Sequence, residues 1–476
     1  MIREPVAIIG AGITGLTAAF CLKRKGIPVT VYEAGGRVGG VIQSIRKGGY
    51  LAECGPNTIL ETSPKIAQLV RDAGLESRRL YSEPKAEARY LVRNRQPVSM
   101  PGSAFGFITT KLFTTRTKLA VLREPFIKAR RDRAEESIAE FVKRRLNQEF
   151  LDQAIDALAA GVYAGDPYKL SVQQAFPRLA ELEARYGSLI KGQIFGACER
   201  KRRGEIAKDR APKFSFDEGL QVLPDTLHER LGDAVKLNVA VTQLVKMDSG
   251  WGISSSAGEA EHSAVIFCGT AYKLAELQLV FDRVALPRGL ELKAAQQQRP
   301  VEKIDFAPFA EIRYPAVASV VLGFRREDVA HPCEGFGMLI PKVESFKILG
   351  TIFSSSLFPN RAPAGHLTLT SYLGGERQPE LASLPAEQLI ELTCEDLRVL
   401  LGARGRPTFA HCVVYPRAIP QYNLGYGRYR GLLAEMENRA PGLFFAGHYR
   451  DGVSLGDSIL SGCNVAERVG KFLTTK

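Results

Sequence analysis

The sequence has no long uncharged apolar run, no closely spaced cysteine pair and few histidines. None of its apolar stretches is both uncharged and long enough to cross a bilayer, for which a helix needs about 20 residues. Its eight cysteines form no C-x-x-C pair, and its six histidines are too few to complete a zinc pattern. We therefore expect reduced cysteines, no structural metal and no integral membrane segment.

The most apolar stretch, Val6 to Leu22, has only a superficial likeness to a signal peptide or a spanning helix. Glycines and the end of a strand interrupt it, and both belong to a nucleotide-binding turn. We expect no targeting segment and a cytoplasmic location.

Length and composition are those of an ordinary globular protein. A chain of 476 residues can bury a large core and divide into two or three domains. Its 64 Lys and Arg residues outnumber its 51 Asp and Glu residues, which gives a formal charge of +13. This excess raises the question of an anionic partner, and the answer depends on where the charge lies.

The strongest motif combines Gly10, Gly12 and Gly15 with the apolar strand that precedes them. Gly10 permits a reversal, Gly12 lets the backbone approach a pyrophosphate, and Gly15 lets the following helix pack on the sheet. The pyrophosphate then lies at the helix N-terminus, beside Ile13 and Thr14. The motif predicts a bound dinucleotide.

An acidic residue and a second glycine turn narrow the choice of dinucleotide. Glu33 ends the next apolar strand, where its carboxylate can accept hydrogen bonds from ribose hydroxyls and would repel the extra phosphate of NADP. Ala34 follows, and Gly39 and Gly40 then form a turn that can close over the pyrophosphate, with Arg37 as a fixed cation. NAD fits the first turn alone, whereas both turns together favour FAD.

The C-terminal region supplies a matching half. An apolar strand, Leu443 to Phe445, leads to Gly447, and Val453 and Ser454 precede a helix that runs past Val469. A helix that begins at the flavin ring would stabilise the negative charge of the reduced ring. His448 stands where many flavoproteins have Asp or Glu. Val241 matches a strand position whose backbone meets the adenine, although a core valine would fit the same spacing.

The order of these segments predicts an α/β fold. We expect a Rossmann-like FAD-binding domain that is discontinuous in sequence, formed by residues 1–84, 206–275 and 431–476. Residues 85–103 and 276–430 would form an α+β substrate-binding domain on a mostly antiparallel sheet. Residues 104–205 would form a helical, basic subdomain. Within the FAD-binding domain we expect a helix at 63–73 and one strand over 235–245.

Charge is concentrated between residues 104 and 133. Eight basic residues lie there against the acidic Glu124 and Asp132, namely Lys111, Arg116, Lys118, Arg123, Lys128, Arg130, Arg131 and Arg133. They alternate with Phe105, Phe107, Ile108, Leu112, Phe113, Leu119, Leu122 and Phe126. This pattern suits either a solvated helical subdomain with its apolar face inward or peripheral contact with an anionic membrane. The segment has no nucleic-acid-binding motif, so we expect no nucleic acid partner.

The glycine turns resemble the extended motif of FAD-dependent amine oxidases, phytoene desaturases and protoporphyrinogen oxidases. Within this superfamily the chain resembles the oxygen-dependent protoporphyrinogen oxidases nearly end to end. The segments that carry this resemblance are Gly55–Thr58, Gly161–Pro167, Ser215–Phe216 with Gly219–Leu220 and Leu223–Pro224, Gly335–Pro341, Leu349–Thr351, Leu373–Gly375 and Ile419–Tyr422.

The resemblance implies a set of substrate-binding residues. Arg89 matches an arginine that pairs with a substrate propionate, a role that suits its rigid guanidinium fork. Gly161 matches a glycine of the pocket wall, and Leu339, Leu349 and Tyr372 match residues that sandwich the macrocycle, although all three could equally be core residues. A flat apolar tetrapyrrole with acid tails needs such apolar walls and a cation at the rim.

The resemblance also implies an activity. The expected reaction is the FAD-dependent, six-electron oxidation of protoporphyrinogen IX to protoporphyrin IX by dioxygen, with release of hydrogen peroxide. Orientation and flavin electronics would supply most of the catalysis, so no general base is nominated. FAD is expected to be non-covalent, with Cys463 an ordinary helix residue. The alternatives are oxidation of coproporphyrinogen III, oxidation of an amine or carotenoid, and a flavin-bound scaffold without turnover. A homodimer is also compatible with the sequence.

Overall fold

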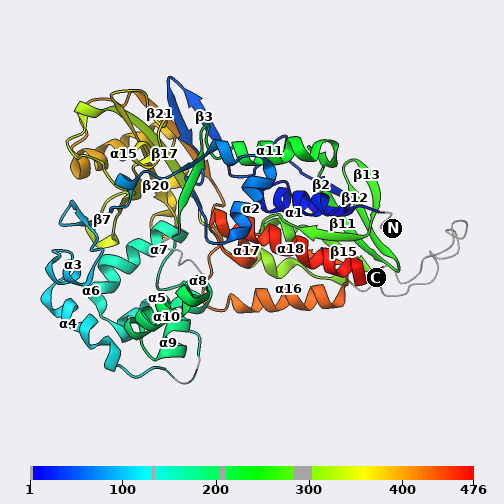
Figure 1. The fold of residues 1–476 in the computed structure, drawn as a ribbon, viewed down its shortest axis with the longest axis horizontal. Helices are drawn as coiled ribbons and strands as arrows, with labels where there is room; N and C mark the ends of the chain where they lie inside the picture. The colour runs from blue at the N-terminus through cyan, green and yellow to red at the C-terminus, as the bar shows by residue number, and fades with distance from the viewer. Residues whose placement is uncertain (1–3, 131, 133, 204–210, 282–302, 476) are drawn as a thin grey trace, which may run out of the picture.

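The computed structural model describes residues 4–130, 132, 134–203, 211–281 and 303–475 (Figure 1). Arg131, Arg133 and the expected domain boundary at 205/206 lie outside these residues.

A five-stranded parallel sheet brings together three distant parts of the chain. Its strand order is β10-β2-β1-β14-β22, with all neighbours parallel. The bounds are β1 Val6–Ile9, β2 Val29–Tyr32, β10 Val235–Lys236, β14 Ala264–Phe267 and β22 Leu443–Phe445. The central strands β1, β14 and β22 are apolar throughout because both faces of a parallel sheet are covered. The expected Rossmann-like architecture, discontinuous in sequence, is confirmed.

Four helices cover one face of this sheet: α1 Ile13–Arg24, α2 Pro64–Ala73, α11 Val222–Leu231 and α18 Leu455–Thr475. The N-terminal helix α1 and the C-terminal helix α18 pack along each other, blue beside red in Figure 1. Helix α2 begins where the sequence indicates, because the Ser63 side chain accepts a hydrogen bond from the Lys65 N–H and Pro64 occupies the first turn.

The other face packs against α12 Ala271–Leu274, α16 Gly427–Arg439 and a second sheet of order β13-β12-β11-β15-β16. Its strands are β11 Val241–Met247, β12 Gly250–Ser255, β13 Gly258–His262, β15 Gln278–Phe281 and β16 Lys303–Ile304.

Two expectations are corrected in this region. The single strand over 235–245 is wrong, because Asn238 has a left-handed backbone (φ 58°) that separates β10 from β11. In addition, β15 pairs with β11, and β16 pairs with β15, so neither strand joins the substrate-binding sheet. The reason is that β15 runs parallel to β11 in register, Leu279 opposite Leu244.

A seven-stranded sheet forms the second large layer, in the order β21-β17-β20-β19-β18-β7-β8. Every pair is antiparallel except β18 with β7. The bounds are β7 Arg89–Arg93, β8 Gln96–Ser99, β17 Val317–Arg325, β18 Gly337–Leu339, β19 Ile348–Ile352, β20 His366–Gly374 and β21 Phe409–Tyr415. Helix α15, Ala386–Leu401, covers one face. The expected mostly antiparallel sheet is confirmed.

The remaining strands are short: β3 Ser44–Lys47 pairs with β4 Tyr50–Glu53, and β9 Lys213–Phe216 lies between β5 Ile59–Leu60 and β6 Arg79–Tyr81. Two short helices, α14 Ser354–Leu357 and α17 His448–Asp451, follow β19 and β22.

Helices dominate residues 104–203, at the lower left of Figure 1. They are α3 Ala104–Thr109, α4 Thr115–Arg123, α5 Ile138–Arg145, α6 Gln148–Phe150, α7 Asp156–Tyr163, α8 Val172–Ala175, α9 Pro177–Tyr186 and α10 Leu189–Arg203. A π-helical turn, Leu151–Ile155, joins α6 to α7.

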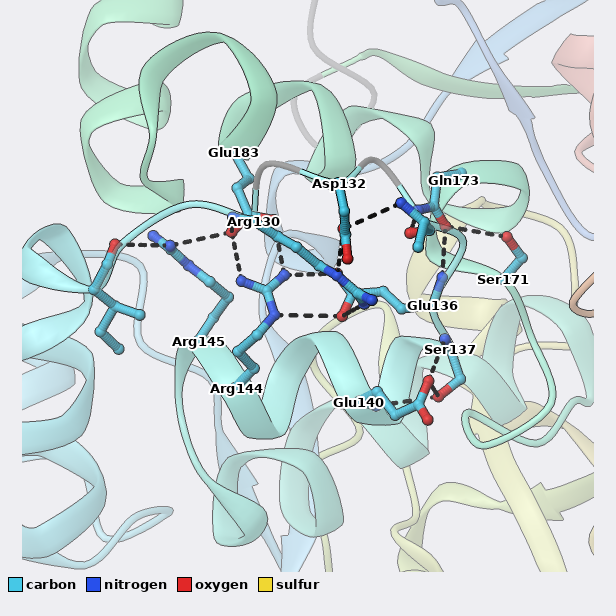
Figure 2. A network of polar contacts seen from close by, with 12 residues as sticks. Arg130, Asp132, Glu136, Ser137, Glu140, Arg144, Arg145, Ser171, Gln173 and Glu183 are labelled. Atoms are coloured by element: carbon cyan, nitrogen blue, oxygen red, sulfur yellow. Dashed lines mark hydrogen bonds and ion pairs between the residues drawn. The ribbon is translucent and has the colours of Figure 1, made fainter.

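An ion-pair network ties these helices together, and Figure 2 shows the part of it around Arg144, Arg145 and Glu183. Arg145, at the end of α5, is fully buried and pairs with Glu124 and Glu183. Its Nη1 also donates to the Ile127 carbonyl at 3.0 Å, and its Nη2 to the Gly187 carbonyl at 3.0 Å. The neighbouring Arg144 bridges Glu183 and Glu136.

Glu124 is the other fully buried member of the network. It accepts hydrogen bonds from the Leu189 N–H at 2.8 Å and the Ser188 hydroxyl at 2.6 Å, so it also caps α10. Burial raises the pKa of Glu124, but the hydrogen bonds from Ser188, Leu189 and Arg145 outweigh it and hold the pKa below its ordinary value.

Five large apolar side chains of the basic segment are exposed, contrary to a subdomain with all of its apolar residues inward. Phe126 is 85% exposed and Phe105 76%, and the others are Ile108, Leu119 and Leu122. Only Leu112 and Phe113 are buried, with Phe107 packed against them. Within the residues that the structure describes, no helix has both the length and the apolar character needed to traverse a bilayer.

Candidate cofactor and substrate site

The first glycine turn leaves open space in front of helix α1. Gly10 has a φ of 102°, and its N–H donates to the Tyr32 carbonyl at 2.8 Å. Gly12 is the N-cap residue, so no side chain caps the helix and its first N–H groups, from Ile13 onward, have no side-chain acceptor. A Cβ built on Gly12 would meet no protein atom within 4 Å, whereas one on Gly15 would lie 2.0 Å from the Gly10 carbonyl oxygen.

The second glycine turn lies directly beside the first. The Gly39 N–H donates to the Ala11 carbonyl at 2.9 Å, and Gly39 forms a parallel bridge with Gly12. The Arg37 guanidinium binds the carbonyls of Val38, Gly40 and Ile42, which fixes it across this turn. Gly40 has a φ of 60°, a conformation that glycine adopts without strain. Two predicted turns thus enclose one space at the N-terminus of α1.

Glu33 lies between this space and the position where the adenosine of the dinucleotide is expected. Its Oε2 accepts the Ala11 N–H at 2.8 Å, and its Oε1 accepts the Gly35 N–H, also at 2.8 Å, beyond the exposed Ala34. Val239, rather than Val241, contacts this residue, because the Val239 N–H donates to the Glu33 carbonyl at 2.8 Å. Val241 begins β11 and pairs with Ser255 instead.

The C-terminal half reaches the same end of the sheet. Gly447 has a φ of 122°, and its N–H donates to the Ser461 hydroxyl at 2.8 Å. Ser454 precedes α18, and its hydroxyl accepts the Asp457 N–H at 3.1 Å, while Val453 is half-buried beside it. The Thr14 hydroxyl of α1 donates to the Ser458 carbonyl of α18 at 3.0 Å, so the first turns of the two helices adjoin.

This geometry fits a dinucleotide. Parallel sheets bind ligands outside the carboxyl ends of their strands, and Gly10, Cys268 and Gly447 follow β1, β14 and β22 at that edge. Two adjoining helix N-termini direct positive dipole ends toward it. The first glycine turn is open where a side chain at Gly12 would lie, and the second glycine turn closes over that space. The residues present are therefore those that would hold FAD.

His448 follows Gly447 directly and is half-buried. Its Nε2 is 3.3 Å from the Tyr314 hydroxyl, and burial lowers the pKa of the imidazole to about 4. The Tyr422 hydroxyl donates to the His448 carbonyl, and the Tyr422 ring lies 5.7 Å from the ring of Tyr163 in α7. Helix α7 is thereby connected to the flavin end.

One face of the seven-stranded sheet looks toward α7. Strands β7 and β18 are parallel, with Arg89 opposite Gly337 and Leu91 opposite Leu339. Leu91 and Leu339 pack with Ala157 of α7, whereas Tyr90 and Met338 pack on the α15 side. Because side chains alternate along a strand, the exposed Arg89 shares the α7 face, two residues from Leu91.

The other predicted pocket residues lie on the same face. A Cβ on Gly161 of α7 would be 2.5 Å from Leu339 Cδ2, so the absence of a side chain lets helix and sheet approach. Leu349 is buried with Ala160 of α7 and with Ala164, which follows the helix, and Tyr372 packs against that cluster. The structure thus brings Gly161, Leu339, Leu349 and Tyr372 together, with Arg89 on the same face of the sheet.

Two further residues belong to this region. Asn57 donates to the Tyr372 hydroxyl at 2.7 Å, which joins the segment Gly55–Thr58 to the sheet. Lys213, on β9, was not predicted: burial and then repulsion by Arg89 lower the pKa of its ammonium group. Nothing in the sequence indicates that Lys213 lies near Arg89, because 123 residues separate the two.

Comparison with known proteins agrees with this geometry. Residues 13–470 match the family model described as flavin containing amine oxidoreductase. Protoporphyrinogen oxidase 2, chloroplastic/mitochondrial, of Arabidopsis thaliana is 35% identical over 98% of this chain and 94% of its own length. The mitochondrial protoporphyrinogen oxidase of Nicotiana tabacum is 34% identical over 98% and 95%, and the coproporphyrinogen III oxidase of Bacillus subtilis (strain 168) is 29% identical over 97% and 96%.

Solved structures share the fold. A crystal structure assigned as a protoporphyrinogen oxidase from Exiguobacterium sp. 255-15 is 21% identical, covers both chains completely and has a TM-score of 0.77. Putrescine oxidase bound to putrescine is 18% identical over 98% of this chain and 99% of its own, with a TM-score of 0.67. At these identities the likeness concerns the fold alone.

Proposed function

Because the chain belongs to the flavin containing amine oxidoreductase family and is an FAD-dependent oxidoreductase of the porphyrin pathway, we propose that its substrate is protoporphyrinogen IX. Dioxygen is the final electron acceptor in this proposal. The product is protoporphyrin IX, and hydrogen peroxide is released.

The observation that carries the proposal is the position of Arg89. It lies on the face of the sheet that also presents Leu91 and Leu339 to Gly161. A wide apolar ring with carboxylate tails needs this combination of apolar walls and a cation at the rim. A monoamine substrate would place its own cation beside the Arg89 guanidinium, and like charges repel.

The chain's residues bind and orient the substrate in this proposal. Arg89 holds a propionate bidentately, and Lys213 adds a second basic side chain to the rim. Leu339 and Leu349 exclude water from the faces of the macrocycle, and Gly161 lets Leu339 lie directly against α7. FAD, when bound, accepts hydride equivalents from the substrate and passes the electrons to dioxygen. No side chain is assigned as a general base, and catalysis rests on orientation.

In this proposal the pyrophosphate is held by Gly10, Gly12, Arg37, Gly39 and Gly40, with the N–H groups of Ile13 and Thr14 directed at it. Gly15 lets α1 pack closely behind the first turn. Glu33, Ala34 and the Val239–Val241 segment hold the adenosine. Gly447, Val453 and Ser454 place the N-terminus of α18 at the flavin ring, where its dipole stabilises negative charge.

The stoichiometry of turnover tests the function. Removal of six electrons requires three molecules of dioxygen per porphyrin and yields three of peroxide. We expect an oxygen electrode and a peroxide assay to give these ratios with protoporphyrinogen IX, and a lower kcat/KM with coproporphyrinogen III. A higher kcat/KM with coproporphyrinogen would reassign the substrate, and turnover of a monoamine alone would reject the proposal.

Replacement of Arg89 by alanine is expected to raise the KM for protoporphyrinogen by roughly 10- to 100-fold. This range corresponds to the loss of a charge-assisted hydrogen bond of about 1.5–3 kcal/mol. The kcat should change little, because the propionate is remote from the reacting carbon. Steady-state kinetics of Arg89→Ala measure both constants. Arg89→Lys is the matched control: it keeps the charge but loses the fork, so its KM should fall between those of the wild type and Arg89→Ala. An unchanged KM in Arg89→Ala would remove Arg89 from the substrate site.

We also propose that the exposed apolar side chains of α3, α4 and the turn after α4 lie on an anionic membrane surface. This apolar patch consists of Phe105, Ile108, Leu119, Leu122 and Phe126. Exposed cations surround it in the sequence, namely Lys111, Arg116, Arg123, Lys128 and Arg130. Apolar anchors among cations are the chemistry of interfacial helices, and each cation near an anionic surface contributes about 1 kcal/mol. The protein would thus lie peripherally on the cytoplasmic face of a membrane.

Sedimentation with phosphatidylserine-containing vesicles tests this contact. We expect binding at low salt that weakens at high salt. Phe105→Ser/Phe126→Ser should reduce affinity at least about tenfold, since each phenylalanine would bury apolar area worth about 1.5–3 kcal/mol. Val399→Ser, an exposed apolar residue on α15, is the control and should bind as the wild type does. The proposal would be rejected if the protein binds vesicles at neither salt concentration. It would also be rejected if light scattering shows that a second copy of the chain covers the patch.

A further inference from the structure

Two cysteines meet where the two cofactor helices cross. Cys21 lies on α1 and is half-buried, and Cys463 lies on α18 and is buried. Neither has a place in the proposed reaction, because both lie more than one turn beyond the helix N-termini that face the cofactor space.

The backbones of helices α1 and α18 approach each other closely. A Cβ on Gly462 would lie 2.5 Å from the Thr14 carbonyl oxygen and 2.8 Å from Thr17 Cβ. Gly462 therefore permits backbone contact in the turn that also carries Cys463. Cys21 follows Thr17 by four residues and so lies on the same side of α1. Cys21 and Cys463 pack in the same core cluster at this helix–helix contact.

The two thiols are hydrogen-bonded to each other, and they are not equivalent. The hydrogen bond from Cys463 lowers the pKa of Cys21 most, and Lys25 and Arg24 lower it further against the effect of burial. The same hydrogen bond, together with burial, raises the pKa of Cys463. The shared hydrogen bond therefore favours the thiolate on Cys21, the less buried member of the pair, over Cys463.

We propose that Cys21 and Cys463 form a reversible disulfide in response to hydrogen peroxide, and that this disulfide links the two helices that hold FAD. Peroxide is the product of the proposed oxidase reaction, and in that respect the physiological role rests on the proposed function. The cysteine chemistry itself requires only peroxide from any source.

The chemistry is balanced in two steps. The Cys21 thiolate attacks one peroxide oxygen, the O–O bond breaks, and Cys21 is oxidised to a sulfenic acid as hydroxide leaves and takes up a proton to give water. The Cys463 sulfur then attacks the Cys21 sulfur, forms the S–S bond and displaces hydroxide, which takes the Cys463 proton and leaves as water. Overall, two thiols and one peroxide give one disulfide and two waters, and a dithiol reverses the change.

The disulfide is expected to hold the two halves of the cofactor site together. Thr14 and Ser458 already join the first turns of α1 and α18, and the new bond would lie about two turns further along α1. It closes a loop that spans nearly the whole chain, so it restricts separation of the N-terminal and C-terminal segments. Release of FAD from the oxidised protein should be several-fold slower than from the reduced protein.

The test uses the purified holoprotein and added hydrogen peroxide, so it does not require turnover of a porphyrinogen. After treatment, remaining thiols are alkylated and the peptides are analysed by mass spectrometry without reduction. We expect one cross-linked product that joins the Cys21 and Cys463 peptides with loss of two hydrogens, and its disappearance with dithiothreitol. Alkylation of both cysteines after peroxide treatment, or a cross-link of Cys21 to another cysteine, would overturn the proposal.

Single serine variants separate the roles of the two sulfurs. Cys463→Ser should leave Cys21 as sulfenic or sulfinic acid, whereas Cys21→Ser should leave Cys463 unoxidised. Cys394→Ser, which replaces another half-buried cysteine, is the matched control and should form the cross-link as the wild type does. FAD release, measured by flavin fluorescence, should slow after peroxide treatment only in the wild type and this control. Equal slowing in Cys463→Ser would contradict the linkage.

Discussion

Replacement of Gly12 by alanine is expected to abolish tight FAD binding without disturbing the protein itself. The new methyl group meets no protein atom within 4 Å, and the φ of −68° at Gly12 suits alanine. In the proposed complex, however, the methyl group occupies the space of the pyrophosphate. We expect the Kd for FAD to rise by at least about 100-fold, as when several hydrogen bonds to a charged group are lost. Flavin fluorescence titration of the apoprotein measures this Kd.

Gly431→Ala is the matched control, because its Cβ also meets nothing within 4 Å and it lies inside α16. It should leave FAD affinity unchanged and stabilise the helix by up to about 1 kcal/mol. The far-ultraviolet circular dichroism of the Gly12→Ala apoprotein should match that of the wild type. Normal FAD affinity in Gly12→Ala would show that the cofactor does not approach this turn.

Replacement of Arg145 by methionine is expected to lower the free energy of unfolding by about 3–5 kcal/mol, because it leaves the fully buried Glu124 without its cation. Methionine has a similar volume, so the loss reports the charge rather than a cavity. Urea unfolding followed by circular dichroism measures it. Lys273→Ala, which removes an exposed ion pair with Glu276, is the control and should change stability little. A loss below about 1 kcal/mol in Arg145→Met would show that the network does not stabilise the helical segment.

The pH dependence of the wild type follows from the same network. Glu124 and Glu183 both have a pKa below the ordinary value of 4.5, because their hydrogen bonds and ion pairs outweigh the effect of burial. Groups with a depressed pKa contribute stability that is complete above the ordinary value and is lost as pH falls through the folded-state pKa. Acid should therefore destabilise the wild type more than it destabilises Arg145→Met.

The cofactor half of the fold could be predicted because each of its turns has a local cause. Gly10, Gly12 and Gly15 permit backbone conformations or contacts that other residues do not, and their spacing is readable from the sequence. The break between β10 and β11 was missed because alternation of apolar residues continues through it. Only Asn238, with its left-handed backbone, marks the point where the chain changes sheets.

The substrate face could not be derived from local patterns. Leu339 and Leu349 are ordinary strand residues by spacing, and Arg89 is an ordinary charge before a strand; their roles depend on the resemblance and stay proposals. Lys213 was missed since its proximity to Arg89 arises only from tertiary packing. The exposure of Phe105 and Phe126 could not be predicted from the sequence either, because an amphipathic helix has the same residue pattern whether its apolar face points inward or outward.

Anaerobic mixing of the yellow holoprotein with protoporphyrinogen IX tests the central claim most directly. The claim is that two distant parts of the chain together bind one FAD, next to the face of the seven-stranded sheet that binds a porphyrinogen. We expect the visible flavin absorption to be lost on mixing and to return when dioxygen is admitted, with formation of the porphyrin. A flavin spectrum that stays unchanged with both protoporphyrinogen and coproporphyrinogen, or a purified protein that is colourless and takes up no FAD, would contradict the account.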